Sequence, residues 1–239
     1  LLAQLFLSSQ AFAKSDSSYF VIASGTLNAP YHRTATALAD VLNKKFRTTQ
    51  ISAIVSQGSS DNLQRLKDRS ADLIIVQRDA AVEAYYDREL PIKNMEVLMP
   101  LFPEALQIFY NGRDEFIPFS EFKSKIQSGA IKHLGIGPEN STTNKTTRRI
   151  LNLLGANVPE SFFDTSPHDI AIKKFESGEL SSVAIISAPP FGKLSNFSFD
   201  SVGVLSLSDN EIRRILGHLR NIDKISFNSS AYRLSLIHI

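Results

Sequence analysis

Three short polar segments carry the side chains best suited to hold a small molecule. They are Ser24-Gly25-Thr26, Ser56-Gln57-Gly58-Ser59-Ser60-Asp61-Asn62 and Gln77-Arg78-Asp79, and each follows a strand-like run. In an open α/β sheet, ligands bind outside the carboxyl ends of the strands, where loop amides and helix N-termini converge. Each segment taken alone fits plain helix capping equally well, since Ser, Thr, Asn and Asp are preferred where helices begin. All three together favour a ligand-binding edge.

These segments show no pattern typical of catalysis, and the sequence as a whole shows none typical of metal binding or nucleotide binding. They contain no G-x-S-x-G or S-x-x-K motif that would set a nucleophile beside a base. The five histidines are His32, His133, His168, His218 and His238. No two have the spacing of metal ligands on one helix face. The run from Gly135 to Asn140 begins like a dinucleotide fingerprint but lacks its third glycine. We therefore expect no metal and no cofactor.

Strand-like runs alternate with helical patterns along the chain. We predict strands at 19–24, 50–56, 72–76, 97–101, 106–110, 131–137, 183–187 and 201–207, with helices between them that include 119–127, 143–154 and 212–219. Strands that alternate with helices need crossover connections, which produce parallel pairing. The sequence therefore predicts an α/β fold with two lobes, each a mainly parallel sheet flanked by helices.

Prolines mark the expected connections between the lobes. We place the first crossing at Pro103-Glu104 and the return at Pro189-Pro190. The expected organisation is residues 14–104 for the first part of lobe 1, 105–190 for lobe 2, 191–228 for an incomplete return to lobe 1, and 229–239 for a tail that continues no pattern and is possibly non-native.

Composition is that of an ordinary globular protein. The 239 residues are 43% hydrophobic and 21% charged, with a formal net charge of +2 and no cysteine. Disulfides and cysteine-based zinc sites are excluded. The balanced charge, spread along the chain, argues against nucleic-acid binding, which needs basic residues clustered on one face.

The first 13 residues resemble the remnant of a signal peptide. An apolar run from Leu1 to Leu7 is followed by the small-residue pattern Ala11-Phe12-Ala13 and then by polar residues from Lys14. The alternative is a buried helix of the mature fold. We expect cleavage after Ala13 and export to the periplasm.

Four motifs then occur in the order and at the spacing of a known family. They are Ile22-Ala23-Ser24-Gly25-Thr26, Gly58-Ser59-Ser60-Asp61-Asn62-Leu63-Gln64-Arg65-Leu66, Ala71-Asp72-Leu73-Ile74-Ile75-Val76-Gln77 and Pro103-Glu104-Ala105. On these motifs the chain resembles the TAXI class of solute-binding proteins that serve TRAP transporters. The resemblance spans Tyr19 to Leu216 and implies a periplasmic-binding-protein type II fold. The family continues beyond this chain's last residue, so the C-terminus is expected to be truncated.

The resemblance implies a receptor that holds a small carboxylate-bearing ligand, such as glutamate or a dicarboxylate, and delivers it to the TRAP membrane permease subunits. The ligand-binding residues it implies are Ser24, Gly25, Thr26, Tyr31, Gln57, Ser59, Asn62, Gln77, Glu104, Ser141, Thr142 and Thr143. Glu104 fits ammonium recognition and a structural role at the crossing equally well. Three arginines, Arg78, Arg113 and Arg149, are candidates for pairing with a ligand charge. The alternative is that each is an ordinary solvated arginine on the surface.

One departure from the family concerns the second lobe. Its glycine-rich G-S-G-T is replaced here by Glu139-Asn140-Ser141-Thr142-Thr143. Loss of glycine reduces close backbone approach, although hydroxyls and amides at a helix start remain. Two other functions stay open: a binding protein of an ABC-type importer or a sensor domain, and an enzyme on the same fold.

Overall fold

The computed structural model describes residues 2–8, 19–46, 48–112, 116–189, 202–219 and 221–226, and for 2–8 the backbone alone. The chain divides into two compact units, Leu1–Pro103 and Glu104–Ile239. The division falls between Pro103 and Glu104, one residue before the end of lobe 1 that the sequence predicts at residue 104. None of the described helices is long and apolar enough to cross a membrane.

Unit 1 is a five-stranded sheet with the order β3-β2-β4-β1-β5. Its elements are β1 (Leu2–Ser8), β2 (Tyr19–Ala23), α1 (Pro30–Lys45), β3 (Gln50–Ile54), α2 (Ser59–Lys67), β4 (Leu73–Gln77), α3 (Arg78–Tyr86) and β5 (Met95–Pro103). β2 pairs in parallel with both β3 and β4. This part of the sheet has the parallel pairing that the strand and helix alternation predicts.

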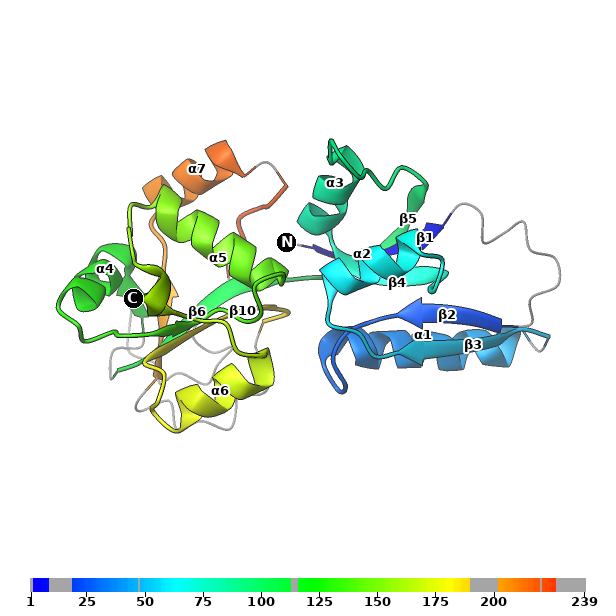
Figure 1. Cartoon of the computed structure of the whole chain (residues 1–239), viewed down its shortest axis with the longest axis horizontal. Coiled ribbons are helices and arrows are strands. Elements are labelled where there is room, and N and C mark those ends of the chain that lie inside the picture. Colours follow the sequence, from blue (N-terminus) through cyan, green and yellow to red (C-terminus); the bar gives the residue numbers. More distant parts are fainter. Residues whose placement is uncertain are drawn as a thin grey trace. The chain divides into compact units, whose positions relative to one another are not determined.

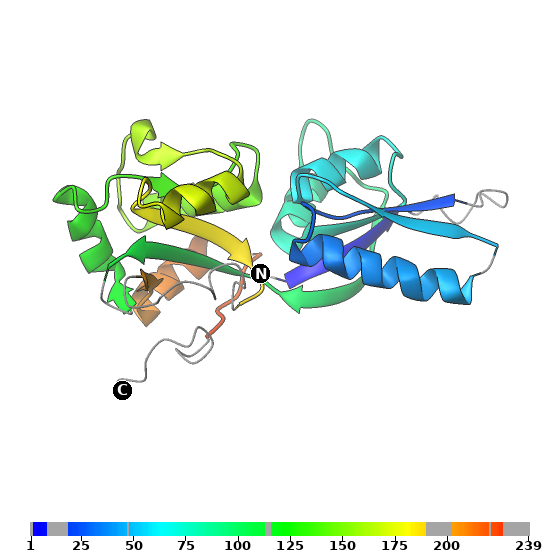
Figure 2. The same ribbon diagram turned by 90° about the horizontal axis from the view of Figure 1, so that it is seen from below.

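All five residues of β4 are buried, because helices cover both faces of the sheet at this strand. Leu73 and Ile75 pack with Tyr31, Ala35 and Ala39 on the buried stripe of α1. Ile74 and Val76 point the opposite way and pack with residues of α2 and α3. Figure 1 shows α1 on one side of these strands and α2 and α3 on the other, and Figure 2 shows α1 running along β2 and β3. The strand's continuous apolar run follows from this double cover.

The apolar N-terminal run forms strand β1. It pairs antiparallel with β4, where Leu5 lies opposite Ile75, and with β5, where Leu5 lies opposite Met99. The buried helix considered for this stretch is therefore wrong. Cleavage after Ala13 stays a prediction, because residues 9–18 lie outside the described part of the chain.

Unit 2 is a six-stranded sheet with the order β7-β11-β6-β10-β8-β9. Its elements are β6 (Ala105–Asn111), β7 (Phe116–Pro118), α4 (Phe119–Gln127), β8 (Leu134–Gly135), α5 (Thr142–Leu153), a 3-10 turn (Glu160–Phe162), β9 (Phe163–Asp164), α6 (His168–Glu176), β10 (Ser182–Ser187), β11 (Val202–Ser206) and α7 (Asp209–His218). β6 pairs antiparallel with both β10 and β11, and the other described pairs are parallel.

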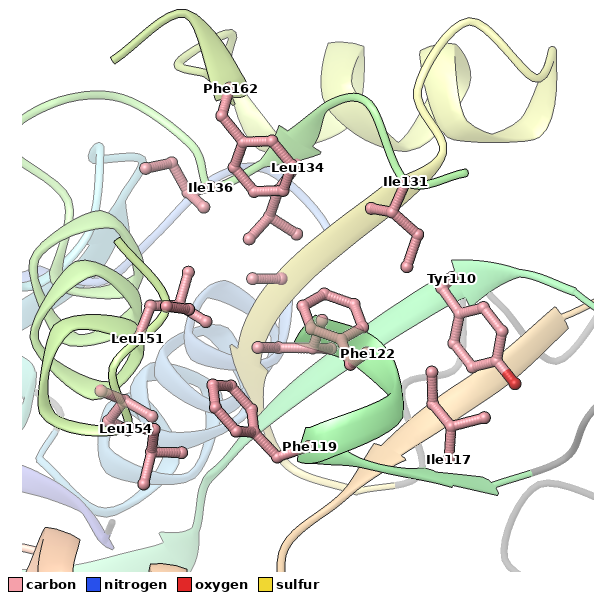
Figure 3. Close-up of a cluster of buried hydrophobic side chains, with 14 of the residues drawn as sticks. Tyr110, Ile117, Phe119, Phe122, Ile131, Leu134, Ile136, Leu151, Leu154 and Phe162 are labelled. Carbon is pink, nitrogen blue, oxygen red and sulfur yellow. The ribbon is translucent and has the colours of Figure 1, made fainter. Parts of the chain in front are cut away.

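Two apolar cores stabilise unit 2, one on each face of its sheet. Figure 1 shows α5 and α7 on one side of β6 and β10 and α6 on the other. In the larger core, Phe119 and Phe122 of α4 converge with Leu151 of α5 and Tyr110 of β6 (Figure 3). In the smaller core, Phe175 of α6 packs with Phe109 of β6 and with alternate residues of β10 and β11.

The expected return of 191–228 to lobe 1 is wrong for the described residues of that range. β11 pairs with β6 and β7 of unit 2, with Val204 opposite Phe109. Ile215 of α7 belongs to the same core as Leu151. Local patterning finds the strand and the helix but contains no information about which sheet they join. Pro190 and the tail 229–239 lie outside the described residues.

Candidate functional site

The three polar segments of unit 1 meet at one edge of its sheet. The parallel strands β2, β3 and β4 all end there, and the loops after them are joined by hydrogen bonds. The Ser56 amide donates to the Gly25 carbonyl at 3.0 Å. The Gln77 amide donates to Ser59 Oγ at 3.1 Å. The segments are therefore adjacent in space, and we call this edge the strand-end edge.

Ser24 is completely buried and links two strands and a helix. Its Oγ donates to the carbonyl of Ile54 at 2.6 Å, and it lies 3.1 Å from Nδ1 of His32. His32 is half-buried in the first turn of α1. In this arrangement the hydroxyl positions its neighbours, and the Ser24 side chain has no exposed surface for a ligand.

Asn62 likewise holds the strand-end edge together. Its Nδ2 donates to the Ser24 carbonyl at 2.6 Å and to the Ile75 carbonyl at 2.7 Å, so one amide joins the ends of β2 and β4. Asn62 is completely buried, and its Oδ1 has no hydrogen-bond partner. Ser59 and Gln77 are also buried, at 7% and 5% exposure.

The side chains of Thr26 and Gln57 are exposed at this edge. Gly25 lies beside them and is buried against Tyr31: an added Cβ would come 3.0 Å from the Cβ of Tyr31. Tyr31 is 9% exposed, and its ring centroid lies 6.0 Å from that of Phe102. Of the residues the sequence predicts here, Thr26 and Gln57 are thus the two whose side chains can reach a ligand without rearrangement.

Helices α1, α2 and α3 all begin at the strand-end edge without a side-chain cap. α1 follows Ala29 and α2 follows Gly58, whose φ of 100° favours glycine. The first amides of a helix have no partner within it and carry partial positive charge. In α2 the first-turn Asp61 offsets part of this charge, and its carboxylate accepts from the Gln57 amide at 3.0 Å. The backbone amides at these helix starts are uncharged hydrogen-bond donors.

In unit 2, the predicted residues lie at the N-terminus of α5. Ser141 is the N-cap, and its Oγ accepts a hydrogen bond from the Asn144 amide. Thr142 is half-buried and Thr143 is buried. Asn144 Nδ2 donates to the Gly137 carbonyl at 2.9 Å, which holds the preceding loop against the helix.

The arginines fall into different environments. Arg148 donates to both carboxylate oxygens of Glu160, at 2.6 and 2.9 Å, and stacks 4.2 Å from the centre of the Phe163 ring. Its role is therefore structural. Arg78 is half-buried and Arg149 is exposed, whereas Arg113 lies outside the described residues.

Glu104 and Gln107 are buried where β6 begins, at 3% and 1% exposure. Gln107 Nε2 donates to the Ala105 and Ser187 carbonyls at 3.3 and 3.2 Å. Its Oε1 has no hydrogen-bond partner. Gln107 and His32 are not among the site residues that the sequence predicts. In the sequence, the one feature that points to Gln107 is its amide side chain within an apolar strand. The one feature that points to His32 is its position directly after Pro30-Tyr31.

One carboxyl group at the strand-end edge has a displaced pKa. Burial raises the pKa of Asp79 above its usual value, and the nearby Glu83 carboxylate adds to the effect, against a hydrogen bond from the Ala80 amide. Within the part of the chain that the structure describes, no group of three His, Asp or Glu side chains could hold a metal ion.

Solved structures with the same fold include three with bound small molecules. The alkanesulfonate-binding protein SsuA from Xanthomonas axonopodis pv. citri, bound to MOPS, is 14% identical with a TM-score of 0.52, over 80% of this chain and 61% of that chain. An ancestral arginine-binding protein bound to glutamine is 13% identical with a TM-score of 0.52, over 86% and 92%. The effector binding domain of QuiR in complex with shikimate is 13% identical with a TM-score of 0.52, over 81% and 82%.

These likenesses establish the fold, which is the α/β type II fold of periplasmic binding proteins. No curated protein matches the chain. A family model does, and it spans both units: residues 22–232 match the NMT1-like family. Because that match covers most of the sequence and includes all three segments of the strand-end edge, this protein belongs to the NMT1-like family.

Proposed function

We propose that this protein is a solute-binding receptor that captures a small carboxylate-bearing molecule, an amino acid such as glutamate or a dicarboxylate. The observation that carries the proposal is the strand-end edge of unit 1. There the uncapped starts of α1 and α2 lie beside the exposed side chains of Thr26 and Gln57. Neutral donors of this kind bind a carboxylate without a salt bridge, which suits a ligand that must be released.

The receptor delivers its solute to a membrane transporter, and the TAXI-like motifs from Ile22 to Gln77 favour TRAP permease subunits as the partner. The periplasm is the proposed location, and its support is the resemblance of the first 13 residues to a signal peptide. The resemblance also implies ligand contacts from Ser141, Thr142 and Thr143, at the start of α5 in unit 2. The ligand has no metal or nucleotide partner in this scheme.

An ABC-type importer is the second candidate for the partner. Structures with this fold include a binding protein component of an ABC phosphonate transporter from Pseudomonas aeruginosa, 12% identical with a TM-score of 0.51. A sensor domain is a further candidate, because the effector binding domain of QuiR has the same fold. The type of permease gene that lies beside this gene would distinguish a TRAP transporter from an ABC-type importer.

An enzyme on this fold is a weaker candidate. Ser24 and His32 are the nearest approach to a nucleophile and its base at the strand-end edge. The hydroxyl proton, however, is directed at the Ile54 carbonyl at 2.6 Å, and Ser24 has no exposed surface. A serine nucleophile needs its proton directed at the base.

A thermal-shift screen against amino acids, dicarboxylates and keto acids tests the proposal. A ligand at a hundredfold excess over its Kd stabilises the folded state by about 2.7 kcal/mol, so selective binding raises Tm. Gln57→Ala should weaken the shift. Gln64→Ala is the matched control, because Gln64 is also exposed on the α2 segment but lies beyond its first turn. Equal shifts in both variants, or turnover of a panel member, would contradict the proposed function.

A further inference from the structure

The hydrogen bonds of Ser24 determine which nitrogen of His32 carries a proton. A serine hydroxyl has one hydrogen to donate, and a carbonyl oxygen can only accept. Ser24 Oγ lies 2.6 Å from the Ile54 carbonyl oxygen, a distance that requires a hydrogen between the two atoms. The single hydroxyl proton of Ser24 is therefore directed at Ile54.

Toward His32, Ser24 Oγ can then only accept. Its distance to Nδ1 is 3.1 Å, so Nδ1 must carry the hydrogen of this bond. A bare Nδ1 would set two lone pairs against each other. The neutral imidazole is consequently the Nδ1–H tautomer, and its Nε2 presents a lone pair.

Nε2 lies on the side of the ring away from Ser24. The bond to Ser24 is the only side-chain hydrogen bond that His32 makes to other described residues. His32 is half-buried at the strand-end edge, where Thr26 is exposed and the Tyr31 ring is packed. Because the His32 ring is half-buried, its Nε2 lone pair is open to a hydrogen-bond donor, either from water or from a ligand.

We propose that Ser24 holds His32 in this tautomer so that Nε2 accepts a hydrogen bond from the bound solute. The inference rests on the proposed function and narrows it. A solute that satisfies both the helix-start amides and Nε2 needs a carboxylate and, close to it, a hydroxyl or an amino group. A 2-hydroxy or 2-amino acid has both groups, whereas a 2-oxo acid or an unsubstituted dicarboxylate has no donor there.

The first arm of the test measures the tautomer in the protein without ligand. Long-range proton-nitrogen NMR at neutral pH distinguishes the protonated from the bare ring nitrogen, and His32→Asn identifies the His32 signals by their loss. His218 is an internal standard, because its Nδ1 faces the Arg214 carbonyl at 2.8 Å and must also be protonated. We expect the same pattern for His32. An Nε2–H tautomer would overturn the inference.

The second arm compares four related solutes by calorimetry: L-glutamate, L-2-hydroxyglutarate, 2-oxoglutarate and glutarate. We expect the first two to bind roughly tenfold tighter than the last two, the worth of about one hydrogen bond. In His32→Asn the side-chain amide still reaches Ser24 but has no counterpart of Nε2, so the preference should disappear. His218→Asn should retain it.

The two arms separate two kinds of failure. Binding with a preference that survives in His32→Asn refutes the role of His32 and leaves the receptor function intact. Binding of none of the four solutes refutes the carboxylate ligand of the proposed function and the ligand part of this inference. The tautomer is decided by NMR in either case.

Discussion

The side-chain amide of Asn62 joins two strand ends: its Nδ2 lies 2.6 Å from the carbonyl oxygen of Ser24 and 2.7 Å from that of Ile75. Both acceptors are backbone groups in a fully buried region, so neither has water to replace the lost donor. Asn62→Ala should lower the free energy of unfolding by roughly 2–4 kcal/mol, since each buried carbonyl loses a partner. Urea denaturation measures the change. Asn152→Ala, at an exposed site on α5, should stay within about 0.5 kcal/mol.

Gly25 is required for the close packing of the β2–α1 turn on Tyr31. In Gly25→Ala the new Cβ would come 3.0 Å from the Tyr31 Cβ, and both are buried. We expect a loss of about 1–3 kcal/mol from overpacking. Gly217→Ala is the matched control, because no atom lies within 4 Å of the added Cβ and the site is helical. That variant should be neutral or up to about 1 kcal/mol more stable. Equal losses in the two variants would contradict the packing argument.

Asp79 should destabilise the folded protein at neutral pH. Burial raises the pKa of its carboxyl above the usual 3.8, so folding favours the neutral form. The stabilising contribution of the protonated group is fully present below the unfolded pKa and is lost as pH rises through the folded pKa. Asp79→Asn, which keeps an acceptor for the Ala80 amide, should therefore raise Tm at pH 7. The gain should shrink as pH falls toward 3.8, and a gain that is constant with pH would refute this account.

The Asp164–Lys174 ion pair should show the opposite pH dependence. Burial acts to raise the pKa of Asp164, but hydrogen bonds from Lys174 and Ser166 outweigh it and hold the pKa below 3.8. Lys174 Nζ lies 2.7 Å from Asp164 Oδ2. The stabilisation is present above the unfolded pKa and is lost as pH falls through the folded pKa. Lys174→Met should lower Tm at pH 7 and have less effect at pH 3, whereas Lys173→Met, at an exposed neighbour, should change Tm little at either pH.

Local signals in the sequence located most described elements to within a few residues. The spacing of Ser208 and Glu211 is that of a capping box, and the two residues form one at the start of α7. Gly155, at φ 77°, follows the C-cap of α5 and occupies the C′ position, which favours glycine. The pair Ser166-Pro167 is typical of a helix start, but α6 begins at His168, and the Ser166 hydroxyl accepts a hydrogen bond from Lys174 in place of capping the helix. Capping competes with contacts to distant side chains, and sequence patterns contain no information about those.

The sequence by itself determined the α/β class, the parallel pairing of β2, β3 and β4, and the polar residues at their ends, because these depend on periodicity and on residues close in the chain. Only the tertiary structure decided the sheet that β11 joins, the strand formed by Leu2–Ser8, and which polar side chains are buried. The sequence predicts Asn62 and Ser24 as ligand contacts, yet the Asn62 Nδ2 and the Ser24 hydroxyl donate to carbonyls 13 to 38 positions away. Such pairings depend on how strands assemble, which no local pattern of residues specifies.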